Sequence, residues 1–479
     1  CAGILTPKEM LEGFSNKGMI TVALLFLVSE GIRQSGTLGQ VIKKLLPQGK
    51  TTVFKAQLRI LPSVAFISAF LNNTPVVVIF APIIKHWAKS VKLPATKFLI
   101  PLSYVTILGG ICTLIGTSTN LVVHGMILEA GYEGFTMFEL GKVGIFIAIA
   151  GIIYLFIFSK RLLPDARPDT AVPDEEVEEG EKLHRVEAVL GARFPGINKK
   201  LSDFNFQRHY GAEVKEIKTR NGQRYVDHLE DVVLREGDTL VVMADDTFIP
   251  TWGESSVFVL LTNGNEPDTT GKKKRWFALL LLVLMIVGAT VGELPITKEM
   301  FPDIKLDMFF FVSITTIIMA WTNLFPARKY TKYISWDILI TIACAFAISK
   351  AMVNSGVADS VAKFIIGLSD DYGPHVLLAM VFIITNLFTE LITNNAAAAL
   401  AFPLALSISA QLGVSPTPFF VVICMAASAS FSTPIGYQTN LIVQGIGNYK
   451  FTDFVRIGLP LNIITFLISI ILIPLIWNF

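Results

Sequence analysis

Two polar triplets interrupt long apolar stretches of this sequence, and their side chains are of the kind that bind ions. Asn72-Asn73-Thr74 lies within the apolar residues 58–84, and Thr393-Asn394-Asn395 lies within residues 376–410. An unpaired polar group in hydrocarbon costs several kcal/mol, so each triplet needs partners. One such triplet could equally serve as a polar contact between helices. Two matched triplets favour an ion or substrate site.

Each triplet is followed downstream by a second interruption that is rich in glycine, threonine and asparagine. The two runs are Thr-Leu-Ile-Gly-Thr-Ser-Thr-Asn at 113–120 and Thr-Pro-Ile-Gly-Tyr-Gln-Thr-Asn at 433–440. Glycine lets the backbone leave the helix and expose its carbonyl groups, and Ser, Thr and Asn add neutral oxygens that suit Na⁺. The helices that restart after Asn120 and Asn440 would direct amides and a partial positive charge toward an anion.

The identity of the coupling ion depends on which groups could carry a proton. Proton coupling would use a buried Asp, Glu or His, and Glu390 and His124 are the candidates near the interruptions. Glu390 has no counterpart near the first triplet, which argues against a symmetric proton relay and favours sodium. Neither triplet has a Lys or Arg, so amides, hydroxyls and helix dipoles would hold an anion. Such a site suits a divalent oxyanion or a carboxylate and does not separate sulfate from a dicarboxylate.

The composition places these interruptions in a polytopic, all-α membrane protein. The chain has 479 residues, of which 52% are hydrophobic and 16% charged, whereas soluble proteins carry about 25% charged residues. The net charge of +2 provides no electrostatic footprint for nucleic acid. The four cysteines have no CxxC spacing, so neither a disulfide framework nor a zinc site is expected. The sequence begins at Cys1 without Met, and we expect native residues before it.

Apolar runs divide the chain into two membrane blocks, 1–160 and 276–479, that flank a polar insert at 161–275. Spanning a bilayer core needs about 20 apolar residues. Runs near this length occur at 17–32, 98–130, 141–159, 276–294, 308–322, 337–353, 417–446 and 457–478. The limbs around each polar triplet have only about a dozen residues, which at 1.5 Å per residue reach about halfway. We expect two re-entrant hairpins, at 58–84 and 376–410, each with its polar tip near mid-membrane.

Basic residues beside the apolar runs predict the orientation of the chain. Lys160-Arg161 ends one run and four basic residues at 272–275 precede the next, and such clusters favour the cytoplasmic side. The insert should therefore lie in the cytoplasm, with the protein in a plasma membrane or a bacterial inner membrane.

The two membrane blocks repeat each other at an interval of 320 or 321 residues. The matched pairs are 35–45 with 355–364, Asn73 with Asn394, Pro82 with Pro403, and 115–123 with 435–443. Threading the chain through the membrane gives the two copies opposite orientations. Inverted repeats with interrupted helices at equivalent positions indicate a secondary transporter with its site near the membrane midplane.

The paired triplets, together with the downstream runs Gly-Thr-Ser-Thr-Asn and Gly-Tyr-Gln-Thr-Asn, resemble the divalent anion/sodium symporter family of the ion transporter superfamily. The resemblance covers both membrane blocks. It implies a homodimer that couples sodium to sulfate or carboxylate transport and moves a transport domain in an elevator-like motion. Family members usually carry Ser-Asn-Thr at each triplet, and many carboxylate transporters have prolines just after the glycine. This chain departs from both patterns, which favours sulfate or a similar small oxyanion.

The resemblance also implies where the ions and the substrate would bind. The first sodium site would be formed by Ser68, Asn72, Asn73 and the backbone near Gly116. The second would be formed by Thr389, Thr393, Asn394 and the backbone near Gly436. The substrate would lie between the triplets and contact Asn73, Thr74, Asn394 and Asn395. Selectivity would depend on Thr117, Ser118, Tyr437 and Gln438.

The insert alternates polar and apolar residues as a small α+β domain does. We expect strands at 184–190, 212–219, 238–244 and 255–261, with a helix at 201–210. The core of the insert, 184–264, is similar to the RCK C-terminal (TrkA-C-like) domain, a ligand-binding regulatory module of potassium channels and several transporters. This similarity implies regulation, with a small molecule as a potential ligand, or dimerisation, rather than catalysis.

These observations predict a sodium-coupled symporter of sulfate or a related divalent oxyanion, of the elevator type and regulated by the insert. It is not expected to be an enzyme or to bind nucleic acid. A sodium-coupled di- or tricarboxylate transporter is an alternative, as is a membrane sensor that binds an anion without transporting it. An ion channel is disfavoured because the chain lacks a Thr-Val-Gly-Tyr-Gly filter.

Overall fold

The computed structural model describes ten stretches of the chain, which include nearly all of both membrane blocks and most of the insert. They are residues 3–47, 49–165, 184–191, 193–219, 223–245, 248–252, 257–262, 272–300, 305–368 and 373–479. The acidic run at 174–182, which is typical of a solvated linker, lies outside them.

Seven helices follow one another in the first membrane block, after the short α1 (Pro7–Glu12). They are α2 (Lys17–Gln34), α3 (Thr37–Leu45), α4 (Val53–Ser68), α5 (Asn73–Ser90), α6 (Leu99–Gly110), α7 (Ser118–Glu129) and α8 (Gly141–Leu162).

The second membrane block opens with helices that precede the repeated set. These are α11 (Lys272–Gly292), α12 (Pro295–Met300), α13 (Met308–Trp321) and α14 (Tyr330–Tyr333). The order of the first block then recurs. The seven equivalents are α15 (Trp336–Asn354), α16 (Val357–Leu368), α17 (Gly373–Leu391), α18 (Asn394–Leu412), α19 (Thr417–Ser428), α20 (Gln438–Gly447) and α21 (Phe451–Ile476).

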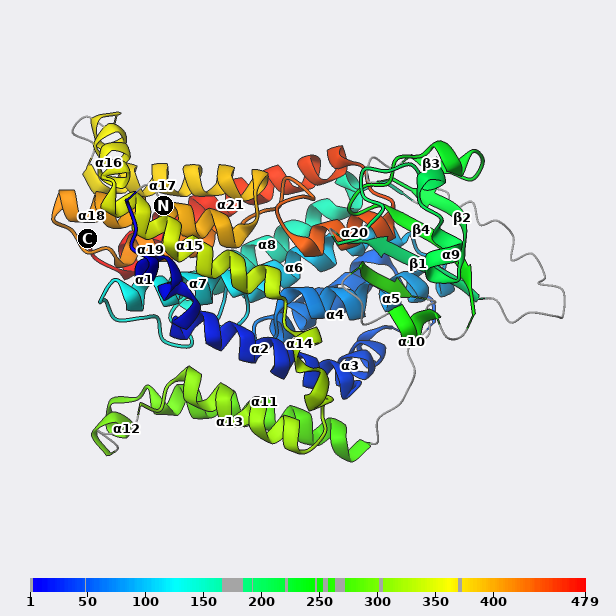
Figure 1. Cartoon of the computed structure of the whole chain (residues 1–479), viewed down its shortest axis with the longest axis horizontal. Coiled ribbons are helices and arrows are strands. Elements are labelled where there is room, and N and C mark those ends of the chain that lie inside the picture. The colour runs from blue at the N-terminus through cyan, green and yellow to red at the C-terminus, as the bar shows by residue number, and fades with distance from the viewer. Residues whose placement is uncertain are drawn as a thin grey trace.

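The equivalent helices α3 and α16, and likewise α5 and α18, lie at opposite ends of the molecule. Figure 1 shows α3 and α5 near the insert, whereas their counterparts α16 and α18 lie at the far end, beside both chain termini. The repeats thus run in opposite directions along the long axis. By length and composition, six of the described helices are long and apolar enough to cross a membrane. Their outer faces are apolar, as α21 illustrates with the exposed residues Leu459, Ile463, Leu467 and Ile471.

The hairpin limbs are longer than the sequence predicted. Helices α17 and α18 have 19 residues each, and α4 and α5 have 16 and 18. At 1.5 Å per residue, these helices are about 24 to 28 Å long, well over half of the hydrocarbon core. The predicted limbs were too short because the helices continue beyond the apolar segment 58–84, from Val53 in α4 to Ser90 in α5, and because the prolines Pro62, Pro82 and Pro403 lie inside helices.

Helices α6 and α19 form the centre of the membrane part and fix the position of the candidate site. Every residue of α6 is buried, and so is every residue of α19 except Thr417. Each is followed by a non-helical stretch, 111–117 or 429–437, before α7 or α20 begins. The predicted apolar runs 98–130 and 417–446 are therefore two broken helices. The first break is almost wholly buried, and the second is buried except around Ser432, Thr433 and Ile435, so most of their backbone groups are shielded from lipid.

The insert is a five-stranded antiparallel sheet with the strand order β3-β2-β4-β1-β5. Its strands are β1 (His184–Leu190), β2 (Glu213–Lys218), β3 (Arg224–Tyr225), β4 (Thr239–Ala244) and β5 (Phe258–Thr262), accompanied by the short helices α9 (Phe206–Tyr210) and α10 (Phe248–Trp252). Four strands correspond to those that the sequence predicts. The predicted helix 201–210 is divided into a 3-10 turn and α9, and the two-residue β3 was not predicted. Aromatic side chains such as Phe194 and Tyr210 fill a core separate from that of the membrane part.

The insert is attached to the membrane part by a charge cluster at the end of α5. Lys85 Nζ lies 3.0 Å from both carboxylate oxygens of Glu187, and Lys218 Nζ lies 3.3 Å from one of them. Burial alone would raise the pKa of the Glu187 carboxyl, but the two lysines lower it to about 2. Nearby, β4 packs on α20, where a Cβ atom on Gly445 would lie 2.6 Å from Thr239 Oγ1.

We expect Glu187→Gln to release the insert from α5. The depressed pKa means that the charged cluster stabilises docking above about pH 4.5 and that this contribution is lost as the pH falls toward 2. Limited proteolysis in detergent at neutral pH should cleave around the insert several-fold faster in the variant, while the membrane part stays intact. The control is Glu213→Gln, whose carboxylate pairs with Lys215 on the exposed surface. Equal cleavage of Glu187→Gln and this control would contradict the docking role.

Candidate functional site

The first polar triplet lies at the start of α5, just after the turn from α4, and its central residue is fully buried. Ser68 Oγ and the Tyr437 hydroxyl lie 2.8 and 2.6 Å from the Asn73 amide. When the Asn73 amide is oriented with its nitrogen toward Ser68, that nitrogen also donates to the backbone oxygens of Thr106 at 2.8 Å and Gly116 at 3.3 Å. The amide oxygen then accepts from the Tyr437 hydroxyl. This orientation satisfies all of the neighbouring groups. Asn73 therefore links its own hairpin to α6, to the first helix break and to the second repeat.

The second triplet lies between α17 and α18 and contacts the first repeat. Asn394 donates to the Thr119 hydroxyl at 2.6 Å. Asn395 Oδ1 accepts from Ser118 at 3.2 Å and from Thr119 at 3.3 Å. Both donors lie in the first turn of α7, so the second hairpin is held at the N-terminus of that helix.

Each hairpin tip contacts the helix break of the opposite repeat through an equivalent pair of residues. Thr74 donates to Gln438 Oε1 at 3.3 Å, and the pair related to it by the repeat is Asn395 with Ser118. Two independent parts of the sequence thus fold to the same contact. The site lies where the two repeats meet.

Tyr437 joins the two halves of this site. Its hydroxyl lies 2.9 Å from Thr117 Oγ1 and 2.6 Å from the Asn73 amide. Thr117 and Tyr437 are equivalent and directly precede α7 and α20. The structure therefore gathers every residue that was predicted to contact the substrate, namely Asn73, Thr74, Thr117, Ser118, Asn394, Asn395, Tyr437 and Gln438.

Equivalent asparagines close the two helix breaks. Asn120 Nδ2 donates to the backbone oxygen of Thr113 at 2.8 Å, and Asn440 Nδ2 donates to that of Thr433 at 3.2 Å. The sequence predicted that the helices restart after these asparagines, yet α7 and α20 begin two residues before them. The asparagine amides satisfy carbonyl groups that the breaks expose, so helical structure resumes earlier than the polar run suggested.

The glycines of the breaks lie directly against the hairpins. A Cβ atom on Gly116 would lie 2.5 Å from Gly110 O and 3.0 Å from Ala69 O. On Gly436 it would lie 2.2 Å from Thr389 O. Contacts this close leave no room for a side chain, so glycine is required at both positions.

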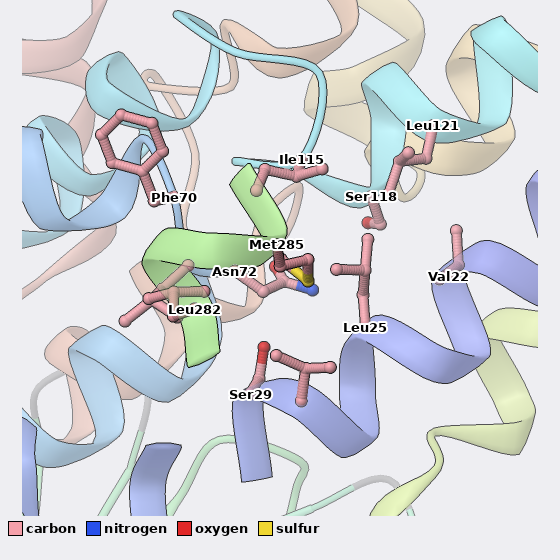
Figure 2. Close-up of a pocket in the computed structure, with 12 residues that line it drawn as sticks. Val22, Leu25, Ser29, Phe70, Asn72, Ile115, Ser118, Leu121, Leu282 and Met285 are labelled. Carbon is pink, nitrogen blue, oxygen red and sulfur yellow. The ribbon is translucent and has the colours of Figure 1, made fainter. Parts of the chain in front are cut away.

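The first predicted sodium site is gathered around Asn73 without Asn72. Ser68, Asn73 and the Gly116 carbonyl meet there. Asn72 is half-buried and lies instead on a small cavity between the first tip, α2 and α11, together with Ser118 (Figure 2). The other lining residues are mostly apolar and include Val22, Leu25, Phe70, Ile115, Leu282 and Met285.

The second predicted sodium site is more dispersed. Thr389 lies against Gly436, and its hydroxyl donates to Ala427 O at 2.6 Å. Thr393 is exposed and caps α18, where its hydroxyl accepts from the Ala396 N–H at 3.4 Å. Asn394 points toward Thr119 in the first repeat. These four predicted ligands therefore do not meet at one point.

Two residues of the site had no place in the sequence prediction. Thr119 binds both asparagines of the second tip. Ser103 of α6 donates to Asn440 Oδ1 at 2.7 Å and to Thr439 Oγ1 at 2.9 Å, and thus fixes the second break to the first repeat. Thr119 belongs to the repeated run 115–123, which could have identified it. A lone serine in an apolar helix, such as Ser103, carries no comparable signal.

Two oppositely directed repeats, each with a hairpin and a broken helix that meet at a polar centre, define a membrane transport protein. A family model described as a citrate transporter matches residues 1–408 and 300–478. The chain belongs to this transporter family. It is an integral membrane transporter rather than an enzyme.

Several relatives match nearly the whole chain. An uncharacterized transporter of Synechocystis is 29% identical over 99% of this chain and 91% of its own length. A putative sulfur deprivation response regulator of Chlamydomonas reinhardtii is 28% identical over 98% of this chain and 94% of its own. A probable sodium/sulfate cotransporter 3 of the same organism is 23% identical over 96% of this chain and 82% of its own.

Proposed function

We propose that this chain is a sodium-coupled symporter of sulfate or a related divalent oxyanion. The observation that carries the proposal is the pair of equivalent contacts between each hairpin tip and the opposite helix break. A substrate held between the tips would touch both repeats at once, so its binding would be coupled to their relative position. The name of the relative described as a probable sodium/sulfate cotransporter supports this substrate and this coupling ion.

Sodium binding is supported by the neutral oxygens around the tips. Within the described part of the chain, no three His, Cys, Asp or Glu side chains are grouped closely enough to hold a metal ion. Ser68 Oγ, the Asn73 amide oxygen and Gly116 O would supply the first site. The amide nitrogen of Asn73 faces Ser68 and Gly116, and rotating the amide by half a turn would direct its oxygen toward the same two groups. Thr389, Thr393, Asn394 and the backbone near Gly436 would supply the second after the tip contacts separate. Hard oxygen donors of this kind suit a small alkali cation.

The oxyanion would be bound by donors without a formal charge. The hydroxyls of Thr74, Thr117 and Ser118 and the amides of Asn395 and Gln438 lie in the contact region. Helices α7 and α20 also begin in this contact region, and the backbone N–H groups at a helix N-terminus favour the binding of an anion. Sodium would supply the countercharge.

We further propose that the two hairpins are re-entrant, although the limbs of the second are long enough to cross a membrane, and that they move with the broken helices as the transport unit of a homodimer. The domain boundaries are those of the sequence: 1–160, 161–275 and 276–479. The insert would act as a cytoplasmic RCK-C-like regulator that responds to a small-molecule ligand. Its docking on α5 and α20 supports this role, because both helices border the site.

Two other functions have specific support. The family description favours a citrate-like carboxylate as substrate, and one relative is named as a putative response regulator, which favours an anion sensor. Uptake of labelled sulfate in competition with excess succinate distinguishes the first alternative. A sensor would bind the anion without sodium-dependent uptake.

Tyr437→Phe should weaken sulfate transport with little effect on folding. The hydroxyl bridges Asn73 and Thr117, and a hydrogen bond to a charged group contributes about 1.5–3 kcal/mol. The sulfate concentration that gives half-maximal uptake should therefore be at least roughly 10-fold higher than in the unsubstituted protein. The control is Tyr154→Phe, whose hydroxyl donates to Ile457 O away from the site. An unchanged sulfate dependence in Tyr437→Phe would remove this residue from the substrate site.

A further inference from the structure

A half-buried carboxylate beside the second tip plays no part in the function proposed above. Glu390 lies near the end of α17, and its Oε1 accepts from the Ser432 N–H at 2.9 Å and from Asn462 Nδ2 at 2.7 Å. Its Oε2 is buried and has no hydrogen-bond partner among the described residues. The same holds for Asn462 Oδ1, on a side chain that is 6% exposed.

Close packing of α21 brings Asn462 to this carboxylate. A Cβ atom on Gly458 would lie 1.9 Å from Phe431 O, so α21 touches the backbone of the second helix break at this point. Asn462 follows one helical turn later on the same face, where its Nδ2 also donates to Ser432 Oγ at 2.9 Å. The arrangement is therefore held by the backbone rather than by flexible side chains.

Leaving a buried carboxylate oxygen without a partner is strongly unfavourable. Within the described ranges, neither Lys nor Arg forms an ion pair with Glu390. The side chains of Glu390 and Asn462 are hydrogen-bonded to each other, and each has one hard oxygen, Oε2 and Oδ1, that lacks a positively charged partner. A cation supplies what both of them need.

The cluster belongs to the second repeat alone. Thr113 donates to Ala69 O in the first repeat as Thr433 donates to Glu390 O in the second, so Ala69 is the equivalent of Glu390. Alanine has no ligand to offer. One additional ion is therefore expected for each chain, not two.

We propose that Glu390 Oε2 and Asn462 Oδ1 bind a further sodium ion, beside the second hairpin and separate from the sodium sites at the tips. The proposal rests on sodium being the coupling ion. This site adds a carboxylate to a set of otherwise neutral sodium ligands. It also adds one sodium ion per transport cycle to those bound at the two hairpin tips.

The test is ²²Na⁺ binding to the purified full chain in the absence of substrate. Glu390→Gln should bind one Na⁺ fewer per chain than the unsubstituted protein, and Asn462→Ala should weaken the same ion at least several-fold. The matched control is Glu139→Gln, because both oxygens of Glu139 have partners, the Thr136 N–H and Trp477 Nε1. Elution as a single species in size-exclusion chromatography verifies that each variant is folded. Because two variants alter the site, the test still works if one of them fails to fold.

The outcomes separate this inference from the proposed function. If the unsubstituted protein binds no Na⁺, sodium coupling itself fails. If it binds Na⁺ and both Glu390→Gln and Asn462→Ala bind the same number with the same affinity, the further site alone is refuted. In proteoliposomes the ratio of ²²Na⁺ to sulfate should fall by one in Glu390→Gln. A variant that keeps this ratio but loses proton uptake would identify Glu390 as a proton carrier and overturn the sodium assignment.

Discussion

Asn73→Ala is expected to abolish sodium-driven sulfate uptake while the protein still reaches the membrane. The Asn73 amide contacts Ser68, Tyr437 and two backbone oxygens, and no other side chain in the membrane can replace it. Each buried partner left unsatisfied costs about 1–3 kcal/mol. The loss of several such contacts should reduce uptake by roughly 100-fold or more.

Asn394→Ala should have an effect of similar size, because this amide joins the second tip to Thr119 of the first repeat. The matched control is Asn354→Ala, whose exposed amide bonds only to Ile4 O and Glu9 Oε1 in the described N-terminal segment. The control should transport normally. Transport at the unsubstituted rate by either tip variant would remove the hairpins from the mechanism.

Gly436→Ala is the second substitution for which we expect a very large effect. The new Cβ atom would lie 2.2 Å from Thr389 O and 2.0 Å from Ser430 Oγ, and a backbone oxygen cannot move aside as a flexible side chain can. The break would have to separate from the hairpin, with a cost of about 1–3 kcal/mol or more. We expect a lower thermal midpoint and loss of uptake.

Gly116→Ala tests whether the repeats behave alike, because its Cβ atom would lie 2.5 Å from Gly110 O. Gly367→Ala in α16 is the control, since nothing lies within 4 Å of the added atom. It should leave both the thermal midpoint and uptake unchanged. If Gly436→Ala matches this control, the packing of break against hairpin does not govern transport.

The repeat and its polar interruptions could be predicted because they are local patterns. Asn73 and Asn394 mark helix starts, and the runs around Gly116 and Gly436 mark the two breaks. Hydrophobic length was a less reliable guide, because buried prolines such as Pro403 do not end helices that neighbouring segments enclose. The predicted hairpin limbs were accordingly too short.

Contacts between distant segments could not be predicted from the sequence. The side chains of Asn73 and Asn394 point toward Tyr437 and Thr119 of the opposite repeat, and these contacts exist only once the two repeats have packed together. The pair of Lys85 with Glu187 spans 102 positions and arises only when the insert docks. Glu390 stands out in the sequence as a candidate proton carrier, but its orphaned oxygen depends on the close approach of α21 at Gly458.

Uptake of radiolabelled sulfate into proteoliposomes, under an inward Na⁺ gradient and then with K⁺ replacing Na⁺, tests the central claim most directly. Parallel samples contain excess unlabelled succinate. We predict uptake that requires Na⁺, that succinate does not inhibit, and that Asn73→Ala abolishes. Sodium-dependent uptake of succinate without sulfate uptake would contradict the oxyanion assignment, and binding of sulfate without any uptake would contradict transport itself.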